Sequence, residues 1–203
     1  MKEMFAYCSS LTSLDLSSFN TSKVTTMQRM FRECKSLANL NIGNFDTSNV
    51  MKMGSMFSNC ESLTTLDLSS FNTANVTNMN WMFSDGNDEN HGCSQLITIF
   101  VSDEWSTQSV EQGEGMFGGC PNLVGGSGTK WDETHTDYTY ARIDGGMSNP
   151  CYLTYKENSS IKNLKAIGDG NTDLYNLNGV KLHGSHTKGV YITNGRKVVI
   201  KLK

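Results

Sequence analysis

The sequence predicts an α/β solenoid, with a parallel sheet on one face, short helices on the other, and a small β-rich module at the C-terminal end. Three observations support this prediction: a repeat of fixed length, an alternating apolar pattern inside each repeat, and Asn-Gly turns between apolar runs near the end. A period of roughly 20–50 residues is typical of proteins in which each repeat is one structural unit that stacks on the next.

The repeat is 26 residues long and runs through roughly the first 120 positions. In each copy a Met-Phe pair is followed by a cysteine, three Leu or Ile residues and a phenylalanine. The three regular copies begin at Met4-Phe5, Met30-Phe31 and Met56-Phe57. Because one such unit is too small to bury its apolar side chains alone, we expect neighbouring copies to share one continuous core.

Within a copy, the segment Leu11–Leu16 reads L-x-x-L-x-L, the strand signature of leucine-rich repeats. Leu14 and Leu16 alternate with Ser13 and Asp15, which predicts a strand with one apolar and one polar face.

The segment that follows each predicted strand, residues 24–34 in the first case, has the pattern of a short helix. Its apolar residues lie close to one helical stripe. The β-branched run at 24–26 leaves an extended backbone open as the alternative. The residues of the stripe in this copy are Val24, Met27, Met30, Phe31 and Cys34.

The regular pattern weakens toward residue 128. Seven residues intrude at 84–90, Gly113 replaces a repeated methionine, and the run 125–128 is rich in glycine. We therefore expect a solenoid over residues 1–128, a C-terminal cap over 129–156, a linker over 157–172 and a β-hairpin module over 173–203. Because the chain opens inside a repeat, we also expect it to be a piece of a longer array.

Composition excludes several classes of function. The chain has 203 residues, 37% of them hydrophobic and 18% charged, which argues against disorder. A net charge of −3 provides no basic surface for nucleic acid. No apolar run approaches the ~18 residues of a membrane span. We find no phosphate loop, Gly-x-Ser-x-Gly or zinc spacing, and expect neither a cofactor nor enzyme activity.

The motif from Leu11 to Cys34, which includes Leu-Asp-Leu-Ser-Ser-Phe-Asn-Thr, resembles the BspA-type leucine-rich-repeat surface proteins of anaerobic oral and gut bacteria. The resemblance covers roughly residues 1–123. The segment 140–150 resembles the closing segment of these arrays, with Cys151 where the family more often has glycine. The tail, 174–192, resembles C-terminal modules of exported proteins, some of which direct secretion and anchoring. The resemblance implies surface display and adhesion to host or bacterial proteins or glycans, with no catalytic residues.

Five of the six cysteines occupy one slot of the repeat. If this slot lies on helices ~8–10 Å apart, disulfides are too far to form, because they need Cα atoms within ~7 Å. We therefore predict free, buried thiols that pack as small hydrophobic side chains. The five cysteines are Cys8, Cys34, Cys60, Cys93 and Cys120.

For the candidate metal-binding and acid–base residues, a structural role explains the sequence better than a chemical role does. Two runs, 85–89 and 169–173, alternate oxygen-bearing residues as a calcium loop does, but both lack its glycine and its final glutamate. His183 and His186 have no evident third metal ligand, and Cys93, beside His91, belongs to the core. His135 with Asp137 and Asp144 is better explained by local hydrogen bonds than by acid–base chemistry. We predict no metal site.

The polar face of the predicted strands is the best candidate for binding. Seven of its eight residues are small and polar, and the eighth is an outward phenylalanine, which either anchors a partner or packs under the inserted loop. The favoured function is non-enzymatic binding at a bacterial surface, and the alternative is a structural stalk. The eight residues are Ser13, Asp15, Asn39, Asn41, Thr65, Asp67, Thr98 and Phe100.

Overall fold

The computed structural model describes residues 1–84, 86, 92–156, 189–193 and 196–200. The chain divides into two compact units, Met1–Ser160 and Ile161–Lys203. The first unit contains parallel sheets and few helices, and the second contains an antiparallel strand pair. We number the repeats from the methionine slot: repeat 1 is residues 1–26, repeat 2 is 27–52, repeat 3 is 53–78, repeat 4 is 79–112, and repeat 5 begins at 113.

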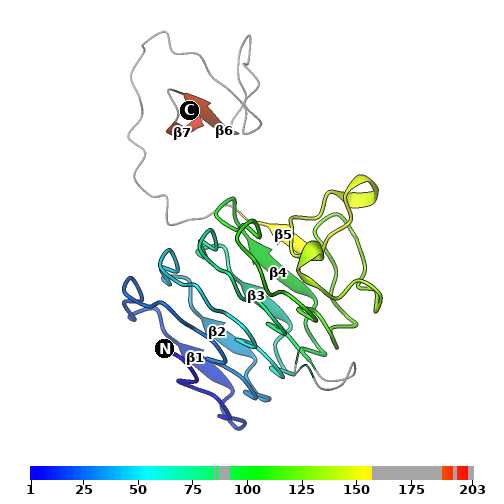
Figure 1. The fold of residues 1–203 in the computed structure, drawn as a ribbon. Coiled ribbons are helices and arrows are strands. Elements are labelled where there is room, and N and C mark those ends of the chain that lie inside the picture. The colour runs from blue at the N-terminus through cyan, green and yellow to red at the C-terminus, as the bar shows by residue number, and fades with distance from the viewer. Residues whose placement is uncertain (85, 87–91, 157–188, 194–195, 201–203) are drawn as a thin grey trace. The chain divides into compact units, whose positions relative to one another are not determined.

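Each of the first four repeats contributes one short strand, as the leucine pattern predicts. These strands lie side by side in chain order, and the sheet that begins at β3 is extended by a strand from the C-terminal part of the first unit (Figure 1). All of the pairs are parallel: β1 with β2, β3 with β4, and β4 with β5. The strands are β1 (Ser13–Asp15), β2 (Asn39–Asn41), β3 (Thr65–Asp67), β4 (Thr98–Val101) and β5 (Leu153–Tyr155).

The prediction of helices on the other side of the repeats is wrong. In repeat 2, alternate backbone N–H groups donate to the next repeat, as Arg29 does to Gly54 O at 3.0 Å and Phe31 to Met56 O at 2.9 Å. The N–H groups between them bond three residues back, as from Cys34 to Phe31 O. An α-helix requires every N–H to bond four residues back, so this alternation excludes it.

The backbone angles confirm that this segment is a series of turns. Several non-glycine residues here have positive φ, including Arg29 at 55° and Glu33 at 62°. Positive φ is incompatible with a right-handed helix. The two 3-10 helices described lie elsewhere, at η1 (Tyr138–Tyr140) and η2 (Gly146–Ser148).

Equivalent side chains form continuous columns through the interior. The ring of Phe57 stacks between Phe31 and Phe83, with ring centroids 5.6 and 5.8 Å away. Phe5 begins this column and Phe117 continues it. A second column joins Phe45 to Phe71. The methionines at the first slot of repeats 2 to 4 are also fully buried; they are Met27, Met53 and Met79.

The cysteines of the column are free thiols, as predicted. The reason given for the prediction, a distance of ~8–10 Å between helices, does not apply, because these segments are not helical. Cys34, Cys60 and Cys93 each lie beside the preceding repeat, and each Sγ donates to a phenylalanine carbonyl there at 3.1–3.2 Å. Burial raises the pKa of Cys34 to about 11 and that of Cys120 to about 12. Cys8 is also a free thiol but is exposed, so the predicted burial is wrong for this one member of the column.

Aromatic side chains of residues 129–156 cover the last repeat. Tyr152 is fully buried, with its ring edge-on to Phe117 at 5.3 Å, and Trp131 Nε1 donates to Phe117 O at 2.8 Å. A Cβ atom at Gly113 would lie 2.4 Å from the Tyr138 ring, which explains why the repeated methionine is missing there.

Asp144 holds the covering segment together. Its carboxylate accepts hydrogen bonds from the Ser127, Thr129 and Gly146 backbone N–H groups at 2.8–3.1 Å and from the Thr129 hydroxyl at 2.7 Å. Burial of the carboxyl would by itself raise its pKa, but the hydrogen bonds outweigh burial and lower the pKa to about 2.

In the second unit, β6 (Gly189–Thr193) pairs antiparallel with β7 (Arg196–Ile200). This pairing confirms the strands predicted on either side of Asn194-Gly195. The hairpin predicted around Asn178-Gly179 lies outside the described residues.

We expect Phe57→Ala to lower the free energy of unfolding by about 3–5 kcal/mol, because it opens a cavity between two stacked rings. Phe5→Ala should cost clearly less, since Phe5 is half-buried and stacks on one neighbour. Urea unfolding followed by circular dichroism measures both. Equal losses would contradict a column in which inner rings carry more of the stability than the first ring.

We expect Asp144→Asn to lower the free energy of unfolding by about 1–3 kcal/mol at pH 7, through weakened charge-assisted hydrogen bonds. The folded-state pKa of about 2 lies below the ordinary 3.8, so the carboxylate stabilises the fold fully above about pH 4. This contribution is lost as the pH falls from 4 toward 2. The variant should therefore show a shallower loss of stability over this range, whereas Glu133→Gln, at an exposed position, should not.

Candidate functional site

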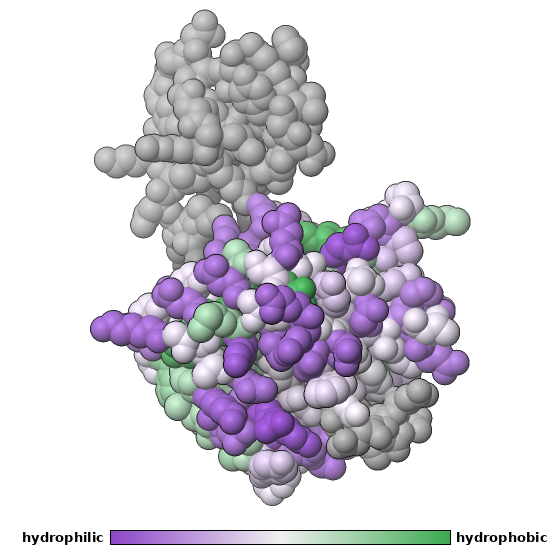
Figure 2. Space-filling model, viewed as in Figure 1, coloured by the Kyte–Doolittle hydropathy of each residue, from purple (hydrophilic) through white to green (hydrophobic). Residues whose placement is uncertain are grey.

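The eight predicted binding residues lie on the outward face of β1 to β4. Strand pairing places Ser13 opposite Asn39, Asp15 opposite Asn41, Thr65 opposite Thr98, and Asp67 opposite Phe100; these four pairs account for the whole set. All eight are exposed or half-buried, whereas Leu66 and Ile99, which alternate with them, are buried. The side facing the viewer in Figure 2 is mostly hydrophilic, with scattered hydrophobic residues.

The strand ladder that carries this row has one interruption. β1–β2 and β3–β4–β5 form separate sheets. Repeats 2 and 3 nevertheless contact one another, because Phe31 stacks on Phe57 and the Thr47 hydroxyl donates to Asn72 O at 2.8 Å. The outward row is therefore built on two strand groups that share one core.

At the N-terminal end of the row, Asp15 and Asn41 form a fixed polar pair. Asn41 Nδ2 donates to Asp15 Oδ1 at 3.0 Å, and the Ser17 backbone N–H donates to the same oxygen at 2.9 Å. The hydrogen bonds from Ser17, aided by the one from Asn41, lower the pKa of Asp15 below its ordinary value. Asp15 is therefore a charged acceptor with a defined orientation.

At the other end, Lys156 reaches across the sheet from just beyond β5. Its ammonium lies 2.6 Å from Asp67 Oδ2 and 5.5 Å from the centre of the Phe100 ring. Burial raises the pKa of Asp67, but hydrogen bonds from Lys156 and Ser69 outweigh it, so the net pKa is lowered. A cation over an aromatic face is attracted by the electrons of the ring, which keeps Lys156 above Phe100.

Lys156 is the functional candidate that sequence reasoning missed. The prediction ended the solenoid at residue 128 and placed 129–156 in a cap, so β5 and the residue after it were not expected on this face. In the structure, β5 extends the row, with Thr154 opposite Phe100. The signal that could have found it is the alternation of Leu153, Thr154 and Tyr155, which matches the pattern of the other strands.

The acid–base candidates do not converge. His135 Nδ1 lies 3.0 Å from the Thr134 hydroxyl, and Asp137 accepts from the Thr139 backbone at 2.8 Å, where it caps η1. Asp144 bonds within the covering segment, as described above. Each of the three therefore has its own local partners.

The part of the chain that the structure describes can also be searched for metal-ligand clusters and for membrane-spanning helices. No cluster of three or more His, Cys, Asp or Glu residues suited to a metal ion occurs among these residues. None of the helices there is long and apolar enough to span a bilayer. The two runs compared with calcium loops lie outside the described residues, apart from Gly86. The same is true of three histidines, His91, His183 and His186.

The chain belongs to a family described as Mycoplasma protein of unknown function, DUF285, whose model matches residues 1–131. The match therefore covers the repeats and the beginning of the covering segment. No curated protein and no solved structure matches the chain.

We expect Lys156→Met to raise the pKa of Asp67, because the ion pair and its hydrogen bond are lost while the apolar stem over Phe100 is kept. Titration of side-chain carboxyl carbons by NMR measures this change. The pKa of Asp15 provides the internal control, since its hydrogen-bond partners are Ser17 and Asn41. An unchanged Asp67 pKa would show that the pair does not persist in solution.

Proposed function

We propose that this chain is a non-enzymatic binding module that recognises a protein or glycan partner through the outward face of β1 to β4. The observation that carries the proposal is the separation of roles along each strand. Inward residues lie in or against a continuous core, and outward residues of paired strands stand directly opposite one another. Polar groups held on regular strands suit recognition, because little of their orientation must be fixed on binding.

The two ends of the row give the partner different contacts. Asp15 with Asn41 offers a carboxylate and an amide in fixed positions. Asp67, Phe100 and Lys156 combine charge with an aromatic surface that remains half-exposed. Aromatic and charged residues together are common at the energetically important centres of interfaces, which makes this second end the expected anchor.

The same repeats support a finer proposal about the fold and the location of the chain. We propose that they form a leucine-rich-repeat solenoid of the BspA type, in which stacked repeats present one extended surface. We further propose, from the resemblance, that the chain acts at the cell surface or outside the cell of a bacterium. It favours an adhesive role toward host extracellular or bacterial surface molecules.

A structural stalk that displays another domain is the second candidate. The observation that favours it is the small size of the outward polar side chains at Ser13, Thr65 and Thr98, which form no side-chain hydrogen bonds with other described residues. A stalk needs a stiff core and an inert surface, and these positions provide such a surface. It would bind no ligand on arrays of proteins and glycans.

We expect the combined variant Asp15→Ala, Asn41→Ala, Asp67→Ala and Phe100→Ala to fold and to lose at least tenfold in affinity for whichever host matrix protein or glycan the native chain binds on an unbiased array. Each of these side chains is at least partly exposed, so its removal opens no cavity in the buried core. Circular dichroism and thermal unfolding check the fold.

A control variant changes exposed residues outside the strands. Glu3→Ala, Tyr7→Ala and Lys35→Ala should leave array binding unchanged. If the strand variant keeps full binding while folded, the strand face is not the binding surface. If the native chain binds nothing on the array, the stalk is the better description.

A further inference from the structure

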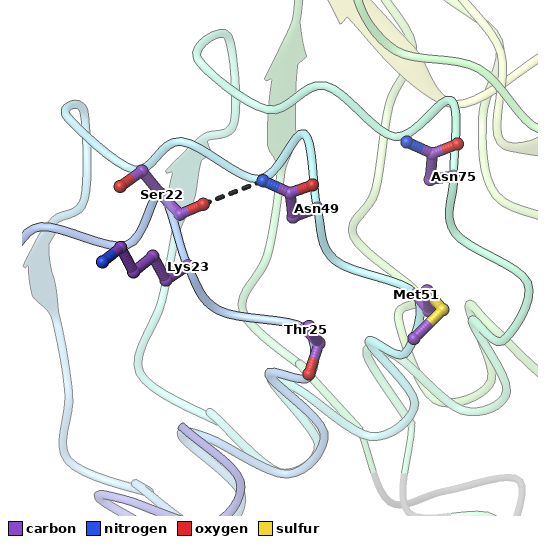
Figure 3. Close-up of a pocket in the computed structure, with 6 residues that line it drawn as sticks. All are labelled: Ser22, Lys23, Thr25, Asn49, Met51 and Asn75. Carbon is purple, nitrogen blue, oxygen red and sulfur yellow. Dashed lines mark hydrogen bonds between the residues drawn. The ribbon is translucent and has the colours of Figure 1, made fainter.

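A shallow groove of about 460 Å³ lies outside the strand face and crosses repeats 1 to 3 (Figure 3). Its size falls within the range of roughly 300–1,000 Å³ that is usual for small-ligand sites. All of its lining residues are exposed except one, which is half-buried. The residues that line it are Ser22, Lys23, Thr25, Asn49, Met51 and Asn75.

The groove is built by two rows of equivalent positions. Lys23, Asn49 and Asn75 occupy the same slot in three successive repeats, and Thr25 and Met51 share another slot. The groove therefore runs along the direction in which the repeats stack, and an extended chain is the ligand shape that can follow it.

The two asparagine amides are held in one orientation. Asn49 Nδ2 donates to Ser22 O at 2.8 Å, and Asn75 Nδ2 donates to Ser48 O at 2.7 Å. These bonds use the N–H side of each amide, and no described residue donates to either Oδ1 atom. Each fixed amide consequently presents an oxygen that accepts hydrogen bonds.

Lys23 and Met51 supply the remaining chemistry. Lys23 is exposed, and its ammonium forms no ion pair or hydrogen bond with a described residue. Met51 has 48% of its surface exposed, which is unusual beside core methionines with none. The groove thus combines hydrogen-bond acceptors, one cation and an apolar surface.

The backbone beside the groove is already occupied by bonds between repeats. The Met51 N–H donates to Thr25 O, and Met51 O accepts from Thr77 N–H, both at 2.9 Å. Ser22 O is taken by Asn49. An extended peptide would find no free strand edge here, whereas a ligand rich in hydroxyl groups needs none.

We propose that this groove binds an extended acidic oligosaccharide that contains uronic acid. Sugar hydroxyls donate to Asn49 Oδ1 and Asn75 Oδ1, a carboxylate pairs with Lys23, and the apolar C–H face of a sugar ring lies on Met51. This site shares no residues with the strand face, so its test is independent of the test of the function proposed above.

The test uses the full chain labelled with ¹³C at the methionine methyl groups and titrated with a hyaluronan hexasaccharide. Met51→Leu assigns the Met51 signal. We expect that signal to shift saturably, while the signal of Met147, fully exposed and outside the groove, stays fixed. Lys23→Gln should weaken the affinity roughly tenfold, as expected for loss of a charged hydrogen bond.

Three controls test the effect of charge and the class of ligand. Lys130→Gln, at another exposed lysine, should not change the affinity. A neutral cellohexaose should bind more weakly than hyaluronan by about the same factor as the Lys23 change. The proposal is overturned if hyaluronan leaves Met51 unmoved, if Lys23→Gln has no effect, or if hexaglutamate shifts Met51 as strongly as the sugar.

Discussion

The structure of the first unit depends on backbone hydrogen bonds between neighbouring repeats. In the turn segment that contains the Met-Phe pair of each of the first four repeats, alternate N–H groups donate to the following part of the stack, as Phe5 does to Met30 O and Phe57 does to Met82 O. These bonds force equivalent residues into register, and the stacked rings and buried thiols follow from that register. Because buried backbone groups must be paired, no repeat is complete without its neighbour. Register between repeats therefore matters more than the conformation of any one of them.

The sequence predicted the strands and the buried columns because both depend on side-chain alternation and on the 26-residue period. It did not predict the conformation of the turns. Val24, Met27, Met30, Phe31 and Cys34 are spaced as on one face of a helix, yet they line the interior from a chain of turns. Side-chain spacing reports which residues face inward, but it does not report whether an N–H bonds within its own repeat or to the next one.

The sequence predicted the position of those candidate residues that lie within the repeats. Asp15, Asn41, Asp67 and Phe100 lie on one outward face as expected. Lys156 was missed because its place on this face depends on β5, which joins the sheet only after the repeats have ended. Similarly, the pattern alone does not explain Gly113, because the Tyr138 ring occupies the space that the side chain of the repeated methionine would fill. Such contacts depend on distant segments and leave no periodic trace.

The inserted stretch between residues 84 and 92 shows how this architecture accommodates change. Ser84 and Gly92 form an antiparallel bridge, and Cys93 then takes its place in the thiol column with its backbone bonded to Phe83 O at 3.0 Å. The interior on either side is undisturbed, since Phe83 and Leu96 are both fully buried. A bridge of this kind allows residues to be added between Ser84 and Gly92 without a change in the packing around the bridge. The length and sequence of the chain between these two residues can therefore vary while the interior sequence stays constant.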